Sequence, residues 1–265
     1  MKINDNFELH LATIWEHISD LVPNELACIS GDEKKTWSEY EKTSARIASF
    51  LNKRGVKKDT KVGLYLFNCS EYLTSQFAIM KVMGVPINVN YRYQSDELVY
   101  LFDNSDSEVV FFHESYSDQV KQVYKKLPGV KTWIQIGGVK DTEIDGCFSY
   151  EEIISSNDPM ERIVRDEDNI YMIYTGGTTG MPKGVIQTHD SNLVPIRRGA
   201  QAFRIPDHPR YFSYLPLSHI AERQIVEFSS IAFGGEISFN ESLATVVRDL
   251  PRTRPHIFFG PPRIW

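Results

Sequence analysis

Strand-like and helix-like segments alternate along residues 61–136, and this alternation restricts the fold more than any other feature of the sequence. Mostly apolar runs fit strands at residues 62–67, 85–89, 108–112 and 131–136. Helical stretches fill the intervals, at residues 70–83, at residues 95–103 and up to residue 127. Repeated strand–helix units with apolar strands form a buried, mainly parallel sheet that helices cover. The sequence therefore predicts an α/β protein.

Further elements are expected on both sides of this region. Ser38 and Glu41 match a capping box that would start a helix through Arg54. Asp190 is expected to cap a helix that runs towards Phe203. The other expected elements are a helix at 7–21, a hairpin at 27–37, a strand at 210–215, a helix up to 232, a strand at 236–239, a helix capped by Ser242 or Glu241, and a last strand at 256–259.

An acidic loop at residues 155–168 suggests a boundary within the chain. It contains Pro159 and follows another loop-like stretch at residues 137–145. We therefore expect a first α/β subdomain at residues 1–165 and a second at residues 166–265.

Composition excludes several classes of protein. With 265 residues, 42% of them hydrophobic and 24% charged, the chain is expected to be globular and not disordered. A net charge of -6 and the lack of a long Lys/Arg stripe argue against nucleic acid as the main partner.

The three cysteines, Cys28, Cys69 and Cys147, are far apart and lack CxxC spacing. They suggest neither a disulfide framework nor a zinc site, and a reducing cytoplasm fits them best. Residues 1–10 lack the apolar core of a signal peptide, and no run of eighteen apolar residues occurs, so any membrane contact is expected to be peripheral.

Residues 170–186 read as a strand, a loop rich in glycine and threonine, and a second strand. Threonine hydroxyls and successive backbone N–H groups can surround an anion, and a lysine adds a mobile positive charge. A polyphosphate such as ATP is the expected ligand. The candidate phosphate-binding residues are Thr175, Gly176, Gly177, Thr178, Thr179, Gly180 and Lys183.

Two other interpretations of this loop differ in what they require of its residues. Most loops rich in glycine and threonine are surface turns, with a solvated lysine in this case. The P-loop of NTPases ends in Gly-Lys-Ser/Thr, whereas this loop ends in Pro182-Lys183-Gly184. Pro182 has no N–H for a phosphate and Gly184 has no hydroxyl for Mg²⁺, so the P-loop mechanism does not apply.

The eleven residues from Tyr174 to Gly184 closely resemble the phosphate-loop signature of the AMP-forming adenylating superfamily. This superfamily comprises acyl-CoA synthetases, luciferases and the adenylation domains of peptide synthetases. Gly176 stands where serine is commoner, a variant that the family tolerates. The resemblance extends over the whole chain and implies two mainly parallel sheets flanked by helices in a layered αβαβα arrangement.

A second signature begins after the expected strand at residues 210–215. A histidine after Pro-Leu-Ser is more often a helix cap or a buried structural group than a functional residue, but the segment from Leu215 to Arg223 resembles the long-chain fatty acyl-CoA synthetases. In these proteins the matching position lines the acyl pocket near the α-phosphate, which implies that role for His219. Residues 254–265 resemble the same group, with Phe258, Phe259 and Trp265 as core or pocket wall.

The resemblance implies an ATP-dependent acyl-CoA ligase for a fatty or similarly apolar carboxylic acid. Thr178, Lys183 and His219 would be the catalytic residues. The substrates would be the acid, ATP with Mg²⁺, and CoA, and no residue of this chain is assigned as a metal ligand. One alternative retains adenylation but transfers the acyl group to a carrier protein or to no acceptor. Another is a truncated, non-catalytic module that binds a nucleotide or an acyl group.

The family continues beyond the segments that this sequence contains. Its adenine-binding and ribose-binding segments, its hinge and its small C-terminal domain with a catalytic lysine have no counterpart here. We therefore expect an N-terminal portion that is truncated before the C-terminal domain and is inactive as a ligase by itself. Apolar sheet surface left uncovered would favour self-association into a homo-oligomer.

Overall fold

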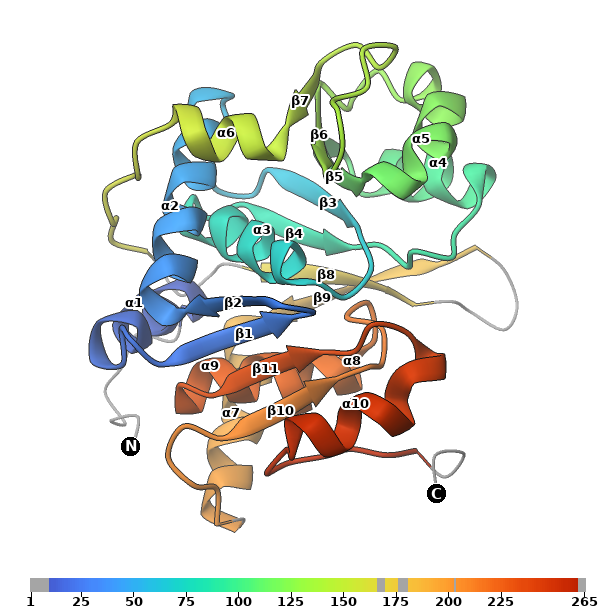
Figure 1. Ribbon diagram of the computed structural model, residues 1–265. Coiled ribbons are helices and arrows are strands. Elements are labelled where there is room, and N and C mark those ends of the chain that lie inside the picture. Colours follow the sequence, from blue (N-terminus) through green and yellow to red (C-terminus); the bar gives the residue numbers. More distant parts are fainter. Residues whose placement is uncertain (1–9, 166–169, 176–180, 203, 262–265) are drawn as a thin grey trace. The chain divides into compact units, whose positions relative to one another are not determined.

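The computed structural model describes residues 10–165, 170–175, 181–202 and 204–261. Contacts between residues divide the chain into two compact units (Figure 1). Unit 1 consists of Met1–Glu41, Asn68–Ser70 and His189–Trp265, and unit 2 consists of Lys42–Phe67 and Glu71–Thr188. The division at residues 165 and 166 stays a prediction.

The sheet of unit 2 has the strand order β7-β6-β5-β3-β4-β8-β9 within the described residues. Every neighbouring pair is parallel except β8 and β9, which are antiparallel. The mainly parallel sheet expected from residues 61–136 is therefore confirmed. Its strands are β3 (Lys61–Tyr65), β4 (Val85–Asn88), β5 (Ser107–His113), β6 (Thr132–Ile136), β7 (Cys147–Ser149), β8 (Ile170–Thr175) and β9 (Lys183–Thr188).

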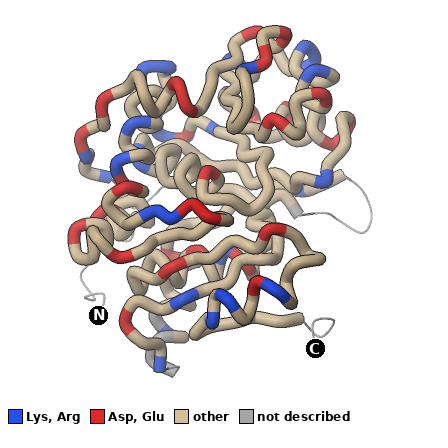
Figure 2. Tube along the Cα trace, viewed as in Figure 1, with Lys and Arg blue, Asp and Glu red and all other residues tan. Residues whose placement is uncertain are grey.

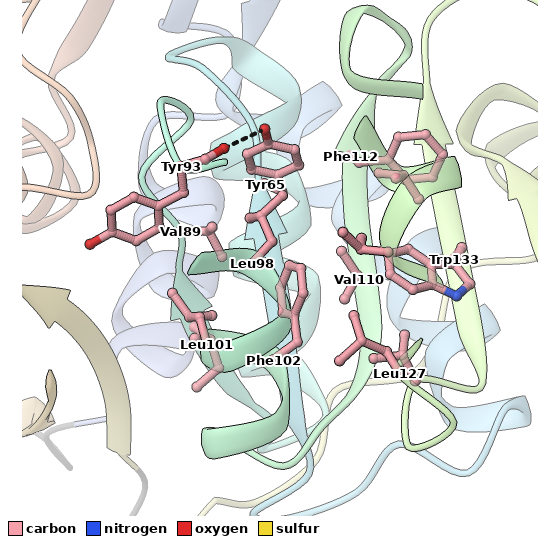
Figure 3. Packing of buried hydrophobic residues seen from close by; sticks show 14 of the residues in the cluster. Tyr65, Val89, Tyr93, Leu98, Leu101, Phe102, Val110, Phe112, Leu127 and Trp133 are labelled. Carbon is pink, nitrogen blue, oxygen red and sulfur yellow. Dashed lines mark hydrogen bonds between the residues drawn. The ribbon is translucent and has the colours of Figure 1, made fainter. Parts of the chain in front are cut away.

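One face of this sheet packs against α4 (Ser95–Asn104) and α5 (Ser117–Val123). Two short 3-10 helices flank α5: η1 (Glu114–Tyr116) lies before it and η2 (Tyr124–Lys126) lies after it. Figure 3 shows Leu98, Leu101 and Phe102 of α4 beside Val110 and Phe112 of β5. Because side chains alternate along a strand, the equally buried Val109 and Phe111 face the other side. Both faces of β5 are therefore covered, as its continuous apolar run predicts.

Unit 2 also contains a second group of helices. These are α3 (Ser70–Lys81), α6 (Tyr150–Ser156) and the part of α2 (Trp37–Lys53) that begins at Lys42. Ser44 Oγ donates to the carbonyl of Thr74 at 3.1 Å, and Arg46 Nη1 donates to the carbonyl of Ile154 at 2.7 Å. These bonds attach α2 to α3 and to α6.

The sheet of unit 1 has the order β10-β11-β1-β2 within the described residues, with β1 and β2 antiparallel and the other pairs parallel. Phe212 and Tyr214 pack with Val246, Leu250 and Phe258 on one side of β10. The strands are β1 (Leu26–Ser30), β2 (Glu33–Thr36), β10 (Arg210–Ser213) and β11 (Glu236–Phe239). The helical elements are α1 (Leu11–Leu21), α7 (His189–Ala202), α8 (Ile220–Glu222), the π-helical η3 (Arg223–Phe228), α9 (Ser229–Phe233), η4 (Leu243–Thr245) and α10 (Val246–Thr253).

Two helix starts differ from the sequence predictions. The capping box of α2 uses Thr36 and Glu39: Glu39 Oε2 accepts from the N–H of Thr36 at 2.8 Å, and Thr36 Oγ1 accepts from the N–H of Glu39 at 3.3 Å. Ser38 and Glu41 match the same four-residue pattern. The helix nevertheless starts at the earlier of the two sites, because β2 ends at Thr36 and α2 begins at the next residue. Asp190 lies in the first turn of α7, where a carboxylate also favours the helix dipole, instead of at its cap.

Other predictions change in the second half of the chain. Residues 256–259 were expected as a strand, but among the described residues they contribute only an isolated bridge between Ile257 and Tyr211. The N–H of His256 donates to Arg210 at 2.9 Å, and no longer ladder forms in this part of the structure. The apolar helix expected up to residue 232 is divided into α8, η3 and α9. β7 and α6 are additional elements, placed between the two expected loops.

Figure 2 shows Lys/Arg and Asp/Glu residues interspersed on the described trace of both units. No helix among the described residues combines the length and the apolar character needed to cross a bilayer. The three cysteines are buried and form no disulfide.

Gly63 in β3 provides a test of the packing in unit 2. A Cβ at this position would lie 2.6 Å from Phe102 Cε1 and 3.3 Å from Val110 Cγ2, both in the core cluster. We expect Gly63→Ala to lower the free energy of unfolding by about 1–3 kcal/mol because the ring cannot move away without strain. Gly199→Ala in α7, where a Cβ meets nothing within 4 Å, is the control and should leave stability equal or up to ~1 kcal/mol higher. Denaturant titration measures both, and equal effects of the two substitutions would contradict this packing.

Candidate active site

The predicted phosphate loop joins two paired strands of unit 2. β8 pairs with β9 from Ile170 opposite Thr188 to Thr175 opposite Lys183. The ladder therefore closes at two of the predicted site residues, and residues 176–182 form the connection between them. The other five predicted phosphate-binding residues, Gly176, Gly177, Thr178, Thr179 and Gly180, lie outside the described residues. The structure thus brings together the backbones of Thr175 and Lys183.

Tyr174 and Gly184 form the neighbouring cross-strand pair. A Cβ on Gly184 would lie 3.0–3.2 Å from atoms of the Tyr174 ring, so the ring packs over the glycine backbone. Tyr174 is buried, which raises the pKa of its hydroxyl, and that hydroxyl donates to Asn104 Oδ1 at 2.9 Å. Gly184 lies within β9 and is not among the glycines with positive φ, so its small size serves this packing. The strand pair is thereby fixed to the end of α4.

Lys183 begins β9 with an exposed side chain. β8 is buried at Tyr171, Ile173 and Tyr174, and it pairs with β4 as well as with β9. An exposed lysine on a rigid strand end can reach an anion held by the adjoining loop. The charge required for binding a phosphate is therefore available at the described edge of the loop.

The second signature lies in unit 1, directly after β10. Asn68 makes hydrogen bonds with three groups of this segment: its Nδ2 donates to Ser213 Oγ at 2.9 Å and to the carbonyl of Leu215 at 2.6 Å. Its Oδ1 accepts from the N–H of Leu217 at 2.9 Å. One amide side chain therefore fixes the path of residues 213–217.

His219 is the N-cap of α8 and is exposed. Its Nδ1 accepts from the N–H of Ala221 at 3.2 Å, and its own N–H donates to the carbonyl of Pro216 at 2.8 Å. Because Nδ1 is an acceptor, the proton of the neutral ring lies on Nε2. His219 can therefore cap the helix and still present an N–H donor to a ligand.

A buried ionisable group follows within one turn. Glu222 is 2% exposed, and its Oε1 is among the buried polar atoms that have no hydrogen-bond partner within the described part of the chain. Burial is the main cause that raises the pKa of Glu222 to about 8, and the charge of Glu227 acts in the same direction. The segment that leads to His219 is thus held by Asn68, and a buried carboxyl lies three residues after the histidine.

Phe258 and Phe259 have different roles. Phe258 stacks on Tyr214 with 5.5 Å between ring centroids and belongs to the core cluster of β10 and α10. Phe259 is 39% exposed, and its carbonyl accepts from the Tyr214 hydroxyl at 2.7 Å. Trp265 lies outside the described residues.

Comparisons with known proteins identify the family of this chain. Residues 15–265 match the family described as AMP-binding enzyme, and the chain belongs to this family. A medium/long-chain-fatty-acid-CoA/3-oxocholest-4-en-26-oate-CoA ligase of Mycolicibacterium smegmatis is 39% identical over 185 residues, which are 69% of this chain and 34% of the relative. A 3-oxocholest-4-en-26-oate-CoA ligase of Rhodococcus rhodochrous is 39% identical over 69% of this chain and 33% of the relative.

Solved structures show the same fold. The anthranilate CoA ligase AuaEII in complex with anthranoyl-AMP has a TM-score of 0.88 at 20% identity, over 95% of this chain and 49% of that chain. A long-chain-fatty-acid-CoA ligase (FadD1) from Archaeoglobus fulgidus has a TM-score of 0.82 at 22% identity, over 96% of this chain and 52% of that chain. The expected α/β fold of the N-terminal portion of adenylating enzymes is therefore confirmed. The chain spans about a third of the length of the curated relatives given above.

Sequence reasoning did not single out Asn68, which holds the second segment, or the buried Glu222. Asn68 contacts groups about 145 positions away in the sequence, and an isolated asparagine carries no signal of such contacts. Glu222 did have a signal, since it stands three residues after His219, where a helix N-terminus often has a glutamate.

The contribution of Asn68 can be measured directly. Asn68→Ala removes three hydrogen bonds of a partly buried segment, so we expect the free energy of unfolding to fall by about 1–3 kcal/mol. Asn24→Ala, at an exposed turn of the same unit, is the matched control and should change stability by less than ~0.5 kcal/mol. If denaturant titration finds Asn68→Ala no more harmful than Asn24→Ala, Asn68 does not hold this segment.

Proposed function

We propose that the complete enzyme, meaning a protein with this chain and the remaining length of its relatives, is an AMP-forming acyl-CoA ligase. The observation that carries the proposal is the strand pair that closes the loop at Thr175 and Lys183, in a chain of the AMP-binding enzyme family. The relatives named above are ligases of fatty and steroid-derived acids, which supports an apolar carboxylic acid as the substrate. Residues 1–265 alone are proposed not to complete the reaction.

The proposed reaction has two steps. A carboxylate oxygen attacks the α-phosphorus of ATP, and the bond from the α-phosphorus to the bridging oxygen breaks, so that pyrophosphate leaves with the electron pair. The sulfur of the CoA thiolate then attacks the acyl carbon, and the carbon–oxygen bond to AMP breaks. The adenylation step depends mainly on positioning and on neutralisation of charge.

We assign the phosphates to Thr175, Gly176, Gly177, Thr178, Thr179, Gly180 and Lys183. Thr178 and Lys183 would stabilise the charge that moves onto the departing pyrophosphate. His219 would lie beside the acyl group, with the Nε2–H as its donor. No group of three or more His, Cys, Asp or Glu in the described part of the chain could hold a metal ion. Mg²⁺ would enter with the substrate as MgATP. We propose a cytoplasmic enzyme that acts on small molecules.

The loop assignment is tested by substitution in the complete enzyme. Lys183→Ala and Thr178→Ala each remove a donor whose bond strengthens as charge develops, so we expect acid-dependent ATP–pyrophosphate exchange to fall about 10²–10³-fold. The acid should bind about as tightly as before. Lys126→Ala, at an exposed lysine outside this loop, should retain full exchange. If both loop variants keep the parent rate of ATP–pyrophosphate exchange, the assignment of Lys183 and Thr178 to the phosphates is wrong.

The substrate class is tested by competition among acids. An apolar pocket favours longer alkyl chains because each buried CH₂ contributes about 0.8 kcal/mol. We therefore expect kcat/KM for adenylation to rise from acetate to medium- and long-chain acids, with free amino acids poor substrates. A complete enzyme that prefers acetate or an amino acid would contradict the apolar-acid proposal and would leave adenylation itself intact.

A further inference from the structure

We propose that Asn104 is a positioning residue for the phosphate side of the site, acting through the Tyr174 ring on the two strand ends that border the phosphate loop. The inference rests on the proposed function, because it assigns a residue to the same reaction. Asn104 is not taken to touch the nucleotide. Its amide oxygen holds a phenol that lies across both strands directly beside the loop.

The Tyr174 side chain extends from β8 across the backbone of β9. Tyr174 and Gly184 are cross-strand partners in the ladder. A Cβ on Gly184 would lie 3.0 Å from Tyr174 Cζ and 3.2 Å from the hydroxyl oxygen, so the far end of the ring covers the glycine. Even the smallest side chain at this position would push the ring aside. The ring therefore bridges the two strands, one residue before Thr175 and one residue after Lys183.

The hydroxyl at the tip of this ring is held from α4. It donates to Asn104 Oδ1 at 2.9 Å, and Asn104 is the last residue of α4. Burial raises the pKa of the Tyr174 hydroxyl, so the group stays protonated and acts as the donor at neutral pH. Because the bond is made at the tip of the side chain, it fixes where the ring lies over β9.

The end of α4 is a firm support for this bond. Leu101 and Phe102 are buried in the core cluster beside β5 (Figure 3). The N–H of Ser105 donates to the carbonyl of Leu101 at 2.9 Å, and Ser105 Oγ lies 2.7 Å from Ser107 Oγ at the start of β5. The residues on both sides of Asn104 are therefore fixed to an inner strand of the sheet.

The loop end of β9 lies at an open position of the sheet. Within the described residues, β9 is the last strand in the order and pairs with β8 on one side. Its residues from Lys183 to Ile186 are exposed. A strand end with few buried contacts opens more readily than the core of a sheet. The ring of Tyr174 over Gly184 limits this opening next to Lys183, the residue at which the chain returns from the loop.

The bond therefore has a consequence for the reaction and not only for stability. Lys183 is proposed to stabilise charge on the departing pyrophosphate, and such a donor acts fully only when it is held close to its productive position. A loosened strand end should slow the adenylation step. Binding of the acid should stay the same, because its proposed contact, His219, belongs to unit 1.

The experiment measures acid-dependent ATP–pyrophosphate exchange in the complete enzyme with Tyr174→Phe, with Asn104→Ala and with both substitutions. Tyr174→Phe keeps the ring and Asn104→Ala keeps the tyrosine, so each removes the same bond. We expect kcat to fall about 10-fold in each single variant, with the KM for the acid unchanged. The double variant should be no slower than the single variants, because substitutions that remove one shared interaction are not additive.

A conservative substitution and a matched control complete the set. Asn104→Asp keeps an acceptor oxygen for the Tyr174 hydroxyl and should stay within about twofold of the parent rate. Asn52→Ala, at an exposed asparagine of α2 in the same unit, should keep the full rate. Parent rates in both single variants, additive losses in the double variant, or an Asn104→Asp variant as slow as Asn104→Ala would each overturn the proposal.

Amide hydrogen exchange separates this proposal from the proposed function. Tyr174→Phe and Asn104→Ala should speed exchange of the β9 amides between Lys183 and Ile186, whereas Asn104→Asp should not, whatever reaction the enzyme catalyses. If the complete enzyme activates no acid, the proposed function fails and the amide exchange alone decides on Asn104. Should Tyr174→Phe not fold, Asn104→Ala at its exposed position tests the same bond. Parent-like amide exchange in Asn104→Ala would overturn the proposal.

Discussion

The pairing of β8 with two different neighbours is the constraint on which the proposed phosphate site depends. On one side β8 continues the parallel sheet through β4, and on the other it forms an antiparallel ladder with β9. A parallel connection requires a long crossover, whereas an antiparallel pair can be joined by a short loop whose two ends lie one strand spacing apart. The core therefore fixes the strand from which the loop begins, and the ladder brings Lys183 back beside Thr175.

Packing and binding place different demands on the residues of this strand pair. Tyr174 and Gly184 form a cross-strand pair in which the ring covers the glycine, and the Tyr174 hydroxyl is bonded to Asn104. Lys183 is one residue away from Gly184 and is exposed. A rigid strand end with a mobile lysine beside it suits a phosphate site. Such a site must bind the phosphates before the reaction and must stabilise the charge that shifts during the reaction. In unit 1, Asn68 provides similar support for the segment that leads to His219.

Much of the fold follows from local sequence patterns, and most corrections involve competing or distant contacts. The strand at residues 236–239 was predicted with its observed bounds because a short apolar run lies between turn signals. The capping box was placed two residues too late because Thr36-x-x-Glu39 and Ser38-x-x-Glu41 both fit the motif. The role of Asn68 depends on contacts that form only when distant segments fold together, and local patterns do not contain them. The functions of Thr178, Lys183 and His219 stay proposals.

The central claim is that the complete enzyme transfers a nucleotidyl group to a carboxylate. The most direct measurement uses an apolar acid labelled with ¹⁸O in both carboxyl oxygens, together with ATP and CoA, followed by mass spectrometry of the nucleotide and phosphate products. Attack on the α-phosphorus leaves one carboxyl oxygen on AMP when the acyl group moves to CoA. The account predicts AMP with one ¹⁸O and unlabelled pyrophosphate. Label in inorganic phosphate with ADP as the nucleotide, or no transfer of label to any phosphorus, would contradict it.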